Sequence, residues 1–166
     1  MHPVLGRLKK GDYRPEVILE AYQALVHHYY PTGRVMLAAL SITMRYGGPK
    51  ASLFLAIVRK NYGCGSYIVG RDQAGVGSYY EPFACQRIFD EFPIGVQVLK
   101  FAETFFCRDC GGMASDRTCA HPTDHRMNTS QTRIREALAR GEALPSEIIR
   151  PEVAQVLSRG DVLITE

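Results

Sequence analysis

The 166-residue sequence has no apolar run long enough to cross a membrane and no apolar signal-peptide core at its N-terminus. It has no internal repeat and no low-complexity stretch, which excludes repeat proteins and compositionally biased chains. Its formal net charge is only +3, so bulk charge gives no argument for nucleic-acid binding. We therefore expect a cytoplasmic protein with no membrane and no nucleic-acid partner.

What the sequence does contain is typical of a globular domain. Hydrophobic residues make up 46% and charged residues 22% of the chain, and its length is enough for one domain with a real core. The five cysteines are an odd number, and three of them cluster, which favours a reducing compartment and a metal site over disulfides.

Short apolar runs alternate along the chain with segments of helical periodicity. The runs are residues 2–5, 35–40, 67–69 and 96–99, and the helices between them open at Pro15, Pro49 and Pro82. This alternation predicts an α/β fold with a parallel sheet and helices on both faces. We expect the second helix to bury Leu53, Phe54, Ile57 and Val58, and further helices to run through Ile134 and from Pro151.

The glycine-rich segment after the third run is the first candidate site. Residues 66–80 read SYIVGRDQAGVGSYY, so that the apolar run breaks at Gly70 and is followed by Arg71 and Asp72. In open α/β sheets ligands bind beyond the carboxyl ends of the strands, and an arginine there offers forked donors to phosphate or sulfate. The spacing alone is equally consistent with an ordinary turn carrying a surface Arg-Asp pair.

The cysteine cluster is the second candidate site. Cys107 and Cys110 form a C-x-x-C pair before two glycines, and Cys119 follows. Three thiolates and one imidazole make a closed tetrahedral zinc site, with either His121 or His125 as the fourth ligand. A redox C-x-x-C and buried inert cysteines are the alternatives.

Six motifs extend over nearly the whole chain: MRYGGP (44–49), RKNYGC (59–64), VGRDQAGVG (69–77), QRIFDEFP (86–93), CGGMASDRTC (110–119) and IRPEVAQVL (149–157). Together, and in this order, they give the chain a resemblance to the ATP sulfurylase (sulfate adenylyltransferase) family of bacteria and archaea. It implies a partial Rossmann-like nucleotidyltransferase domain over residues 1–104, and a zinc knuckle with C-terminal helices over residues 105–166.

The resemblance also implies the reaction and its residues. Sulfate would attack the α-phosphorus of ATP bound with Mg²⁺, giving adenosine 5′-phosphosulfate and pyrophosphate. The family's loop motif maps to Gly70, Arg71, Asp72 and Gln73 for ATP and to Ala74 for sulfate, with the main chain near Ala102 beside adenine. Arg71 is the residue expected to act in catalysis, because cations near the shared negative charge supply much of the rate in such transfers.

The sequence departs from the family in several places. Family members carry a Q-x-R-N-x-x-H-x-x-H motif upstream, and this chain contains no His-x-x-His. Gln73 stands where histidine is usual, Gly47 where alanine is common, Gln131 for glycine and Arg133 for lysine. Because residues 2–5 resemble the end of a strand, we expect a piece of a longer protein. We expect negligible activity from the chain alone, because the upstream motif would supply half of the residues that bind the anions. Its expected partners are a missing N-terminal half or copies of itself; the rival prediction is a non-catalytic nucleotide-binding or assembly module.

Overall fold

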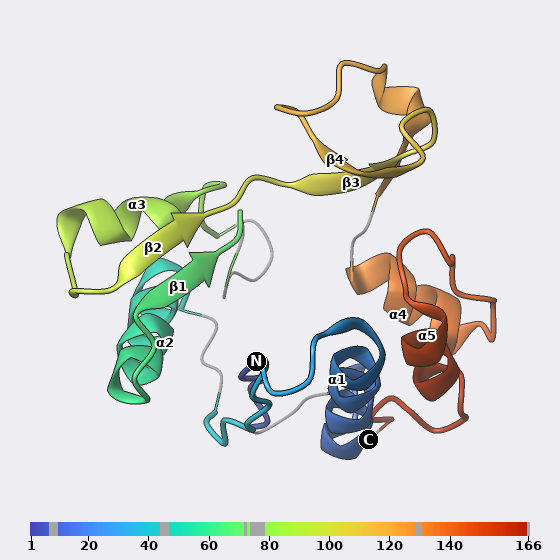
Figure 1. Cartoon of the computed structure of the whole chain (residues 1–166), viewed down its shortest axis with the longest axis horizontal. Coiled ribbons are helices and arrows are strands. Elements are labelled where there is room, and N and C mark those ends of the chain that lie inside the picture. Colours follow the sequence, from blue (N-terminus) through green and yellow to red (C-terminus); the bar gives the residue numbers. More distant parts are fainter. Residues whose placement is uncertain (7–9, 44–46, 72, 74–78, 129–130, 166) are drawn as a thin grey trace. The chain divides into compact units, whose positions relative to one another are not determined.

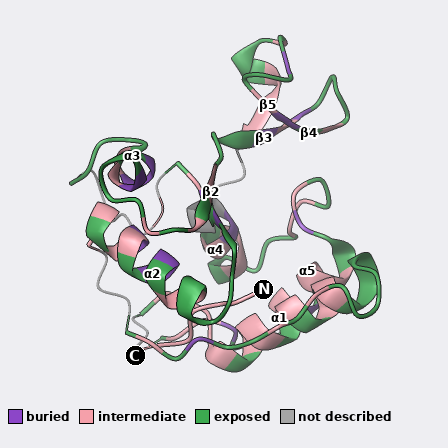
Figure 2. Ribbon diagram, turned by 60° about the vertical axis from the view of Figure 1, so that its left-hand side comes forward, coloured by how far each residue is buried: buried purple, intermediate pink, exposed green. Residues whose placement is uncertain are grey.

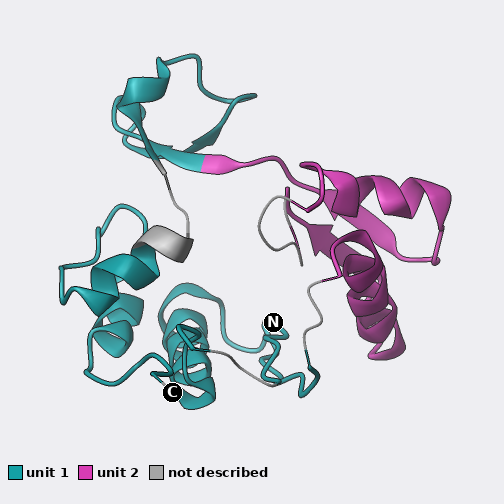
Figure 3. Ribbon diagram, turned by 180° about the vertical axis from the view of Figure 1, so that it is seen from behind, with its two compact units in different colours: residues 1–43, 105–166 teal, residues 44–104 magenta. Residues whose placement is uncertain are grey.

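The computed structural model describes residues 1–6, 10–43, 47–71, 73, 79–128 and 131–165 (Figure 1). These residues form two compact units, one of residues 1–43 and 105–166 and one of residues 44–104 (Figure 3). The two compact units do not test the division into domains 1–104 and 105–166, which stays a prediction.

Residues 44–104 form a small α/β unit in the order α2 (Pro49–Asn61), β1 (Ser66–Val69), α3 (Ala84–Glu91) and β2 (Gln97–Lys100). The two strands pair in parallel, as the alternation of runs and helices predicts, with Ser66 opposite Gln97 and Val69 opposite Lys100. Proline opens α2 because its fixed φ suits a first turn whose N–H has no helical partner. The carboxyl ends of β1 and β2 therefore lie side by side.

The prediction of which α2 face is buried was wrong. The structure buries Ser52, Leu55 and Ala56, whereas Phe54 is 54% exposed. Figure 2 shows that α2 carries buried and exposed residues along its length. In β1 only alternate side chains are buried, and Ile68 is 60% exposed. The apolar residues of α2 extend around the helix, so periodicity alone could not select the stripe that packs against β1 and α3.

This assignment predicts unequal effects of two neighbouring truncations. Leu55→Ala is expected to lower the free energy of unfolding by about 2–5 kcal/mol, because it leaves a cavity in the core. Phe54→Ala is expected to cost less than about 1 kcal/mol, because the side chain is half in water. Urea denaturation of both variants measures the difference, and equal losses would contradict the observed face.

The run at residues 35–40 does not form the predicted buried strand. It forms one parallel bridge, between Val4 and Leu40, and Met36 is 81% exposed. Backbone hydrogen bonds link it to the N-terminal segment, with the N–H of Leu40 donating to the carbonyl of Pro3 at 2.9 Å. A strand of a parallel sheet is buried only when neighbours and helices cover it, and among the described residues this run pairs on one side only.

Helices α1 (Pro15–Tyr29), α4 (Gln131–Ala139) and α5 (Pro151–Leu157) occur near the predicted positions. Polar contacts join α1 to the region of α5. The Tyr29 hydroxyl donates to Glu152, and Arg14 forms an ion pair with Asp161 at 2.8 Å. No residue of α1 is fully buried. The apolar side chains of α1 are thus only partly covered, and the two polar contacts add to their packing.

The segment between β2 and α4 forms a small sheet of strands in the order β4-β3-β5. Its strands are β3 (Thr104–Cys107), β4 (Gly112–Ser115) and β5 (Arg126–Asn128), and the 3₁₀ helix η1 (Thr123–His125) precedes β5. A core of Phe105, Cys107, Ala114 and Cys119 lies in this region. Among all the described residues, no helix is both long enough and apolar enough to cross a membrane.

Candidate metal centre and candidate active site

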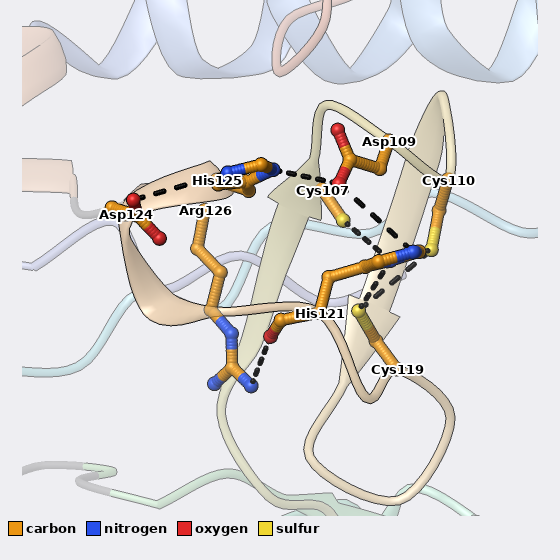
Figure 4. Close-up of polar contacts among 8 residues, drawn as sticks. All are labelled: Cys107, Asp109, Cys110, Cys119, His121, Asp124, His125 and Arg126. Carbon is orange, nitrogen blue, oxygen red and sulfur yellow. Dashed lines mark hydrogen bonds and ion pairs between the residues drawn. The ribbon is translucent and has the colours of Figure 1, made fainter.

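Four predicted metal ligands converge in the small sheet region. Their ligand atoms all lie within 4.8 Å of one another, and Figure 4 shows the side chains pointing toward a common centre. They are Cys107 at the end of β3, Cys110 in the turn before β4, Cys119 after β4, and His121.

The distances among these atoms fit a tetrahedral metal ion. Nδ1 of His121 lies 3.5, 3.4 and 3.5 Å from the sulfurs of Cys107, Cys110 and Cys119, and the last two sulfurs are 3.7 Å apart. Zinc bond lengths of about 2.3 Å to sulfur and 2.0–2.1 Å to nitrogen give tetrahedral edges of about 3.8 Å and 3.6 Å. The donor set and its spacing therefore fit zinc.

The local sequence explains how the C-x-x-C pair folds around this centre. Gly111 adopts a left-handed φ of +62°, which closes the turn between β3 and β4. The backbone N–H of Cys110 donates to the Cys107 sulfur and is the main cause that lowers the pKa of this thiol to about 6. Hydrogen bonding with Cys107 raises the pKa of the Cys110 thiol to about 11. Cys107 is the last residue of β3 and Cys110 lies in the turn before β4, whereas a redox C-x-x-C lies at the start of a helix.

Of the two histidines that the sequence left open as the fourth ligand, His125 lies outside the cluster that contains His121. Its Nδ1 is 2.6 Å from Oδ2 of Asp109, and this hydrogen bond is the main cause that raises the pKa of His125. The reason lies in the strand register: β5 places Arg126 opposite Cys107, and the carbonyl of His125 accepts from the N–H of Arg108 at 3.0 Å. Asp109 also lies 3.9 Å from Nε2 of His121, the ring nitrogen that faces away from the sulfurs.

Arg126 supports the loop that carries His121, a role that no pattern in the sequence predicted. Its guanidinium lies 4.1 Å above the ring centre of Phe105 and forms an ion pair with Asp116 at 2.6 Å. One Nη donates to the carbonyl oxygen of His121 at 3.3 Å (Figure 4). Outer contacts of this kind orient metal ligands.

Arg126→Met is therefore expected to weaken metal binding by about 10–100-fold, although it removes no ligand. Competition with a chromogenic chelator measures the change. Arg117→Met is the matched control, because it removes the same charge from an exposed position of the same loop. Equal affinities of the two variants would contradict the supporting role of Arg126.

The second candidate site lies at the carboxyl ends of β1 and β2. Arg71 follows β1, and its guanidinium forms an ion pair with Glu103, which follows β2, at 3.3 Å. Both side chains are half-exposed, so this pair contributes little to stability. Ala102 is the residue before Glu103, so the structure brings Arg71 and Ala102 to the same end of the sheet. Glu103 was missed, and its place a few residues after the fourth run was the available signal.

Gln73 lies between β1 and α3. Its side-chain Nε2 donates to the hydroxyl of Tyr67 at 2.5 Å, and its backbone carbonyl accepts from the thiol of Cys85 at 2.7 Å. Burial is the main cause that raises the pKa of Tyr67. Gly70 and Gln73 thus have defined positions, whereas Asp72 and Ala74 lie outside the described residues.

A separate hollow lies in the unit of residues 1–43 and 105–166. It has a volume of about 530 Å³ and is lined by α1, α4, α5 and the N-terminal segment. Apart from Tyr13 and Tyr22, its lining side chains are apolar. It offers no cation to an anionic substrate, so the strand ends remain the candidate active site.

Known proteins resemble this chain over nearly its whole length. The family model described as ATP-sulfurylase matches residues 1–160. The chain belongs to the ATP-sulfurylase family. Among curated relatives named sulfate adenylyltransferase, that of Aeropyrum pernix is 49% identical over 166 residues, covering 99% of this chain and 43% of the relative. That of Staphylothermus marinus is 48% identical, covering 95% of this chain and 41% of the relative.

The chain thus spans less than half the length of these ATP-sulfurylase relatives. One solved structure, titled hexameric APS kinase from Thiobacillus denitrificans, matches 98% of this chain and 30% of its own. The TM-score is 0.65 and the sequence identity 19%, so this likeness concerns the fold. It confirms an α/β fold that contains a small parallel sheet.

Proposed function

We propose that this chain contributes the nucleotide side of a sulfate adenylyltransferase active site. The whole enzyme would convert ATP, bound with Mg²⁺, and sulfate into adenosine 5′-phosphosulfate and pyrophosphate. The relatives that carry this name support the proposal. The observation that carries it is the meeting of Arg71 and Glu103 at the carboxyl ends of two parallel strands, where α/β proteins bind ligands.

In the proposed reaction a sulfate oxygen forms a bond to the α-phosphorus of ATP. The bond from the α-phosphorus to the oxygen bridging to the β-phosphate breaks, and pyrophosphate leaves. Gly70, Arg71, Asp72 and Gln73 would bind the nucleotide, Ala74 would donate its N–H to sulfate, and the main chain at Ala102 would lie beside adenine. The guanidinium of Arg71 would stabilise negative charge shared by the reacting groups.

We further propose that the α/β fold is of the Rossmann-like nucleotidyltransferase type. The phosphates of ATP would be held mainly by hydrogen-bond donors in fixed positions, because transfer at phosphorus needs little covalent catalysis by the protein. Gln73 can donate a hydrogen bond to a phosphate oxygen but cannot carry a proton, so charge stabilisation there would depend on Arg71.

The cysteine cluster is proposed to hold one structural zinc ion. Cys107, Cys110, Cys119 and His121 supply four protein ligands, which leaves no open position for substrate. Bound there, the ion would hold the turns after β3 and β4 together.

The second candidate function is that of a nucleotide-binding module that does not itself catalyse the transfer. It is considered because the chain spans only 43% and 41% of the length of the two relatives named above. The proposed partners are further copies of the chain or a polypeptide that supplies the upstream motif. Sedimentation of the chain with and without the N-terminal half of a relative distinguishes these partners.

One experiment separates the two functions. Calorimetry would measure MgATP binding to the chain, and a coupled assay would measure sulfate-dependent release of pyrophosphate with and without that N-terminal half. Binding together with turnover supports the transferase, whereas binding without turnover in both mixtures supports the module. Failure of the chain to bind MgATP would refute both.

A further inference from the structure

Gln86 is one of two polar residues buried in the described part of the chain, with 8% of its surface exposed. It lies in the first turn of α3. Its Nε2 atom donates to the carbonyl oxygen of Val69 at 3.1 Å and to that of Phe101 at 2.8 Å. A carboxamide nitrogen carries two hydrogens, so one NH₂ group satisfies both carbonyls.

The two carbonyls belong to the ends of the paired parallel strands. Val69 is the last residue of β1, and Phe101 directly follows β2. The N–H of Phe101 donates to the carbonyl of Val69 at 3.0 Å, so Gln86 closes a ring of hydrogen bonds around the last rung of the sheet. One residue beyond each carbonyl lie Gly70 and Ala102, where the candidate active site begins.

The start of α3 holds the chain after β1 at two further points. The N–H of Phe83 donates to the carbonyl of Arg71 at 3.0 Å, and the thiol of Cys85 donates to that of Gln73 at 2.7 Å. Phe83 adopts a left-handed φ of 66°, which is costly for a bulky residue and persists only where surrounding contacts enforce it. These bonds make α3 the support of the loop that carries Arg71.

We propose that Gln86 is a positioning residue of the nucleotide site. Its carboxamide sets the separation of the ends of β1 and β2, so that Arg71 and the main chain at Ala102 face one ligand. This inference rests on the proposed function, because it assigns no ligand of its own. An apolar side chain of the same size would remove this donor from the part-buried Phe101 carbonyl and from the buried Val69 carbonyl.

The test compares Gln86→Met with Gln97→Met. Methionine matches glutamine in length but offers no donor, and Gln97 is an exposed β2 residue that contacts the Ser66 hydroxyl at 3.1 Å. We expect Gln86→Met to weaken MgATP binding at least about tenfold with its circular dichroism unchanged, and Gln97→Met to change it by less than about twofold. Native-like binding by Gln86→Met would overturn the inference.

Gln86→Glu supplies a readout that a loss of packing would not produce. Above its pKa the carboxylate has no hydrogen to donate to two carbonyls, and burial raises that pKa. When protonated, the carboxyl can donate one bond. The ratio of its MgATP dissociation constant to that of the native chain is therefore expected to fall at least about threefold from about pH 8 to about pH 5.5, while the ratio for Gln86→Met stays constant. A constant ratio for Gln86→Glu would count against the inference.

If Gln86→Met does not fold, the native chain still decides the matter. Saturation with MgATP is expected to shift the side-chain amide resonances of Gln86 in nuclear magnetic resonance spectra more than those of Gln97. Equal or absent shifts in a chain that binds MgATP would overturn the positioning role alone. A native chain that does not bind MgATP would instead refute the proposed function.

Discussion

Replacing Cys107 with serine is expected to abolish tight zinc binding. The native chain should retain about one ion, because structural sites of this kind bind zinc with apparent free energies of about 10–16 kcal/mol. The variant loses the most buried of the three thiolates, with 0% of its surface exposed, and serine is a poor zinc ligand. We expect affinity to fall at least about thousandfold and the small sheet to lose its fixed structure. Elemental analysis after dialysis and near-ultraviolet circular dichroism measure both effects.

The two histidines provide the matched control. His121→Ala is expected to release the ion, because Nδ1 of His121 lies 3.4–3.5 Å from all three sulfurs. His125→Ala is expected to retain it, because His125 contacts Asp109 instead. Retention by His121→Ala together with loss by His125→Ala would show that the observed ligand set is wrong. Zinc retained at native affinity in Cys107→Ser would refute the metal centre itself.

Replacing Arg71 with alanine is expected to weaken MgATP binding by about 10–100-fold. A hydrogen bond to a charged group contributes about 1.5–3 kcal/mol, and the guanidinium at the end of β1 is the cation proposed to meet the phosphates. Arg71→Lys is expected to recover only part of this loss, because an ammonium cannot form the forked pair of bonds to two oxygens. Calorimetric titration of the folded variants measures the affinities.

Two neighbouring changes test whether this effect is local. Glu103→Gln removes the carboxylate that pairs with Arg71 at 3.3 Å and is expected to strengthen MgATP binding by about two- to fivefold. Arg87→Ala removes an exposed arginine of α3 that pairs with Glu81, a residue before the helix, and is expected to leave the affinity unchanged. If Arg87→Ala weakened binding as much as Arg71→Ala, the loss would reflect net charge rather than a site at the strand ends.

Much of the secondary structure could be predicted from local sequence. Proline marked the starts of α1, α2 and α5. The parallel pairing of β1 and β2 followed from the helix between them, because such a crossover brings consecutive strands into parallel order. These features depend on residues close together in the chain.

Burial was predicted less well because it depends on distant segments. The apolar run at 35–40 and the face of α2 that carries Phe54 both contain residues typical of a core, yet Met36 and Phe54 are exposed. The hydrophobic pattern indicates which side chains can be buried. Which of them are buried depends on the segments that pack against them.

The sequence by itself determined the family, the three cysteines of the metal cluster and the position of Arg71 after a strand. Only the tertiary structure decided that His121 rather than His125 completes the cluster, that Glu103 meets Arg71, and that Gln86 joins two strand ends. The physical reason is that these contacts depend on strand pairing. The register of β5 against β3 turns His125 toward Asp109, and the pairing of β1 with β2 brings together chain segments about thirty residues apart.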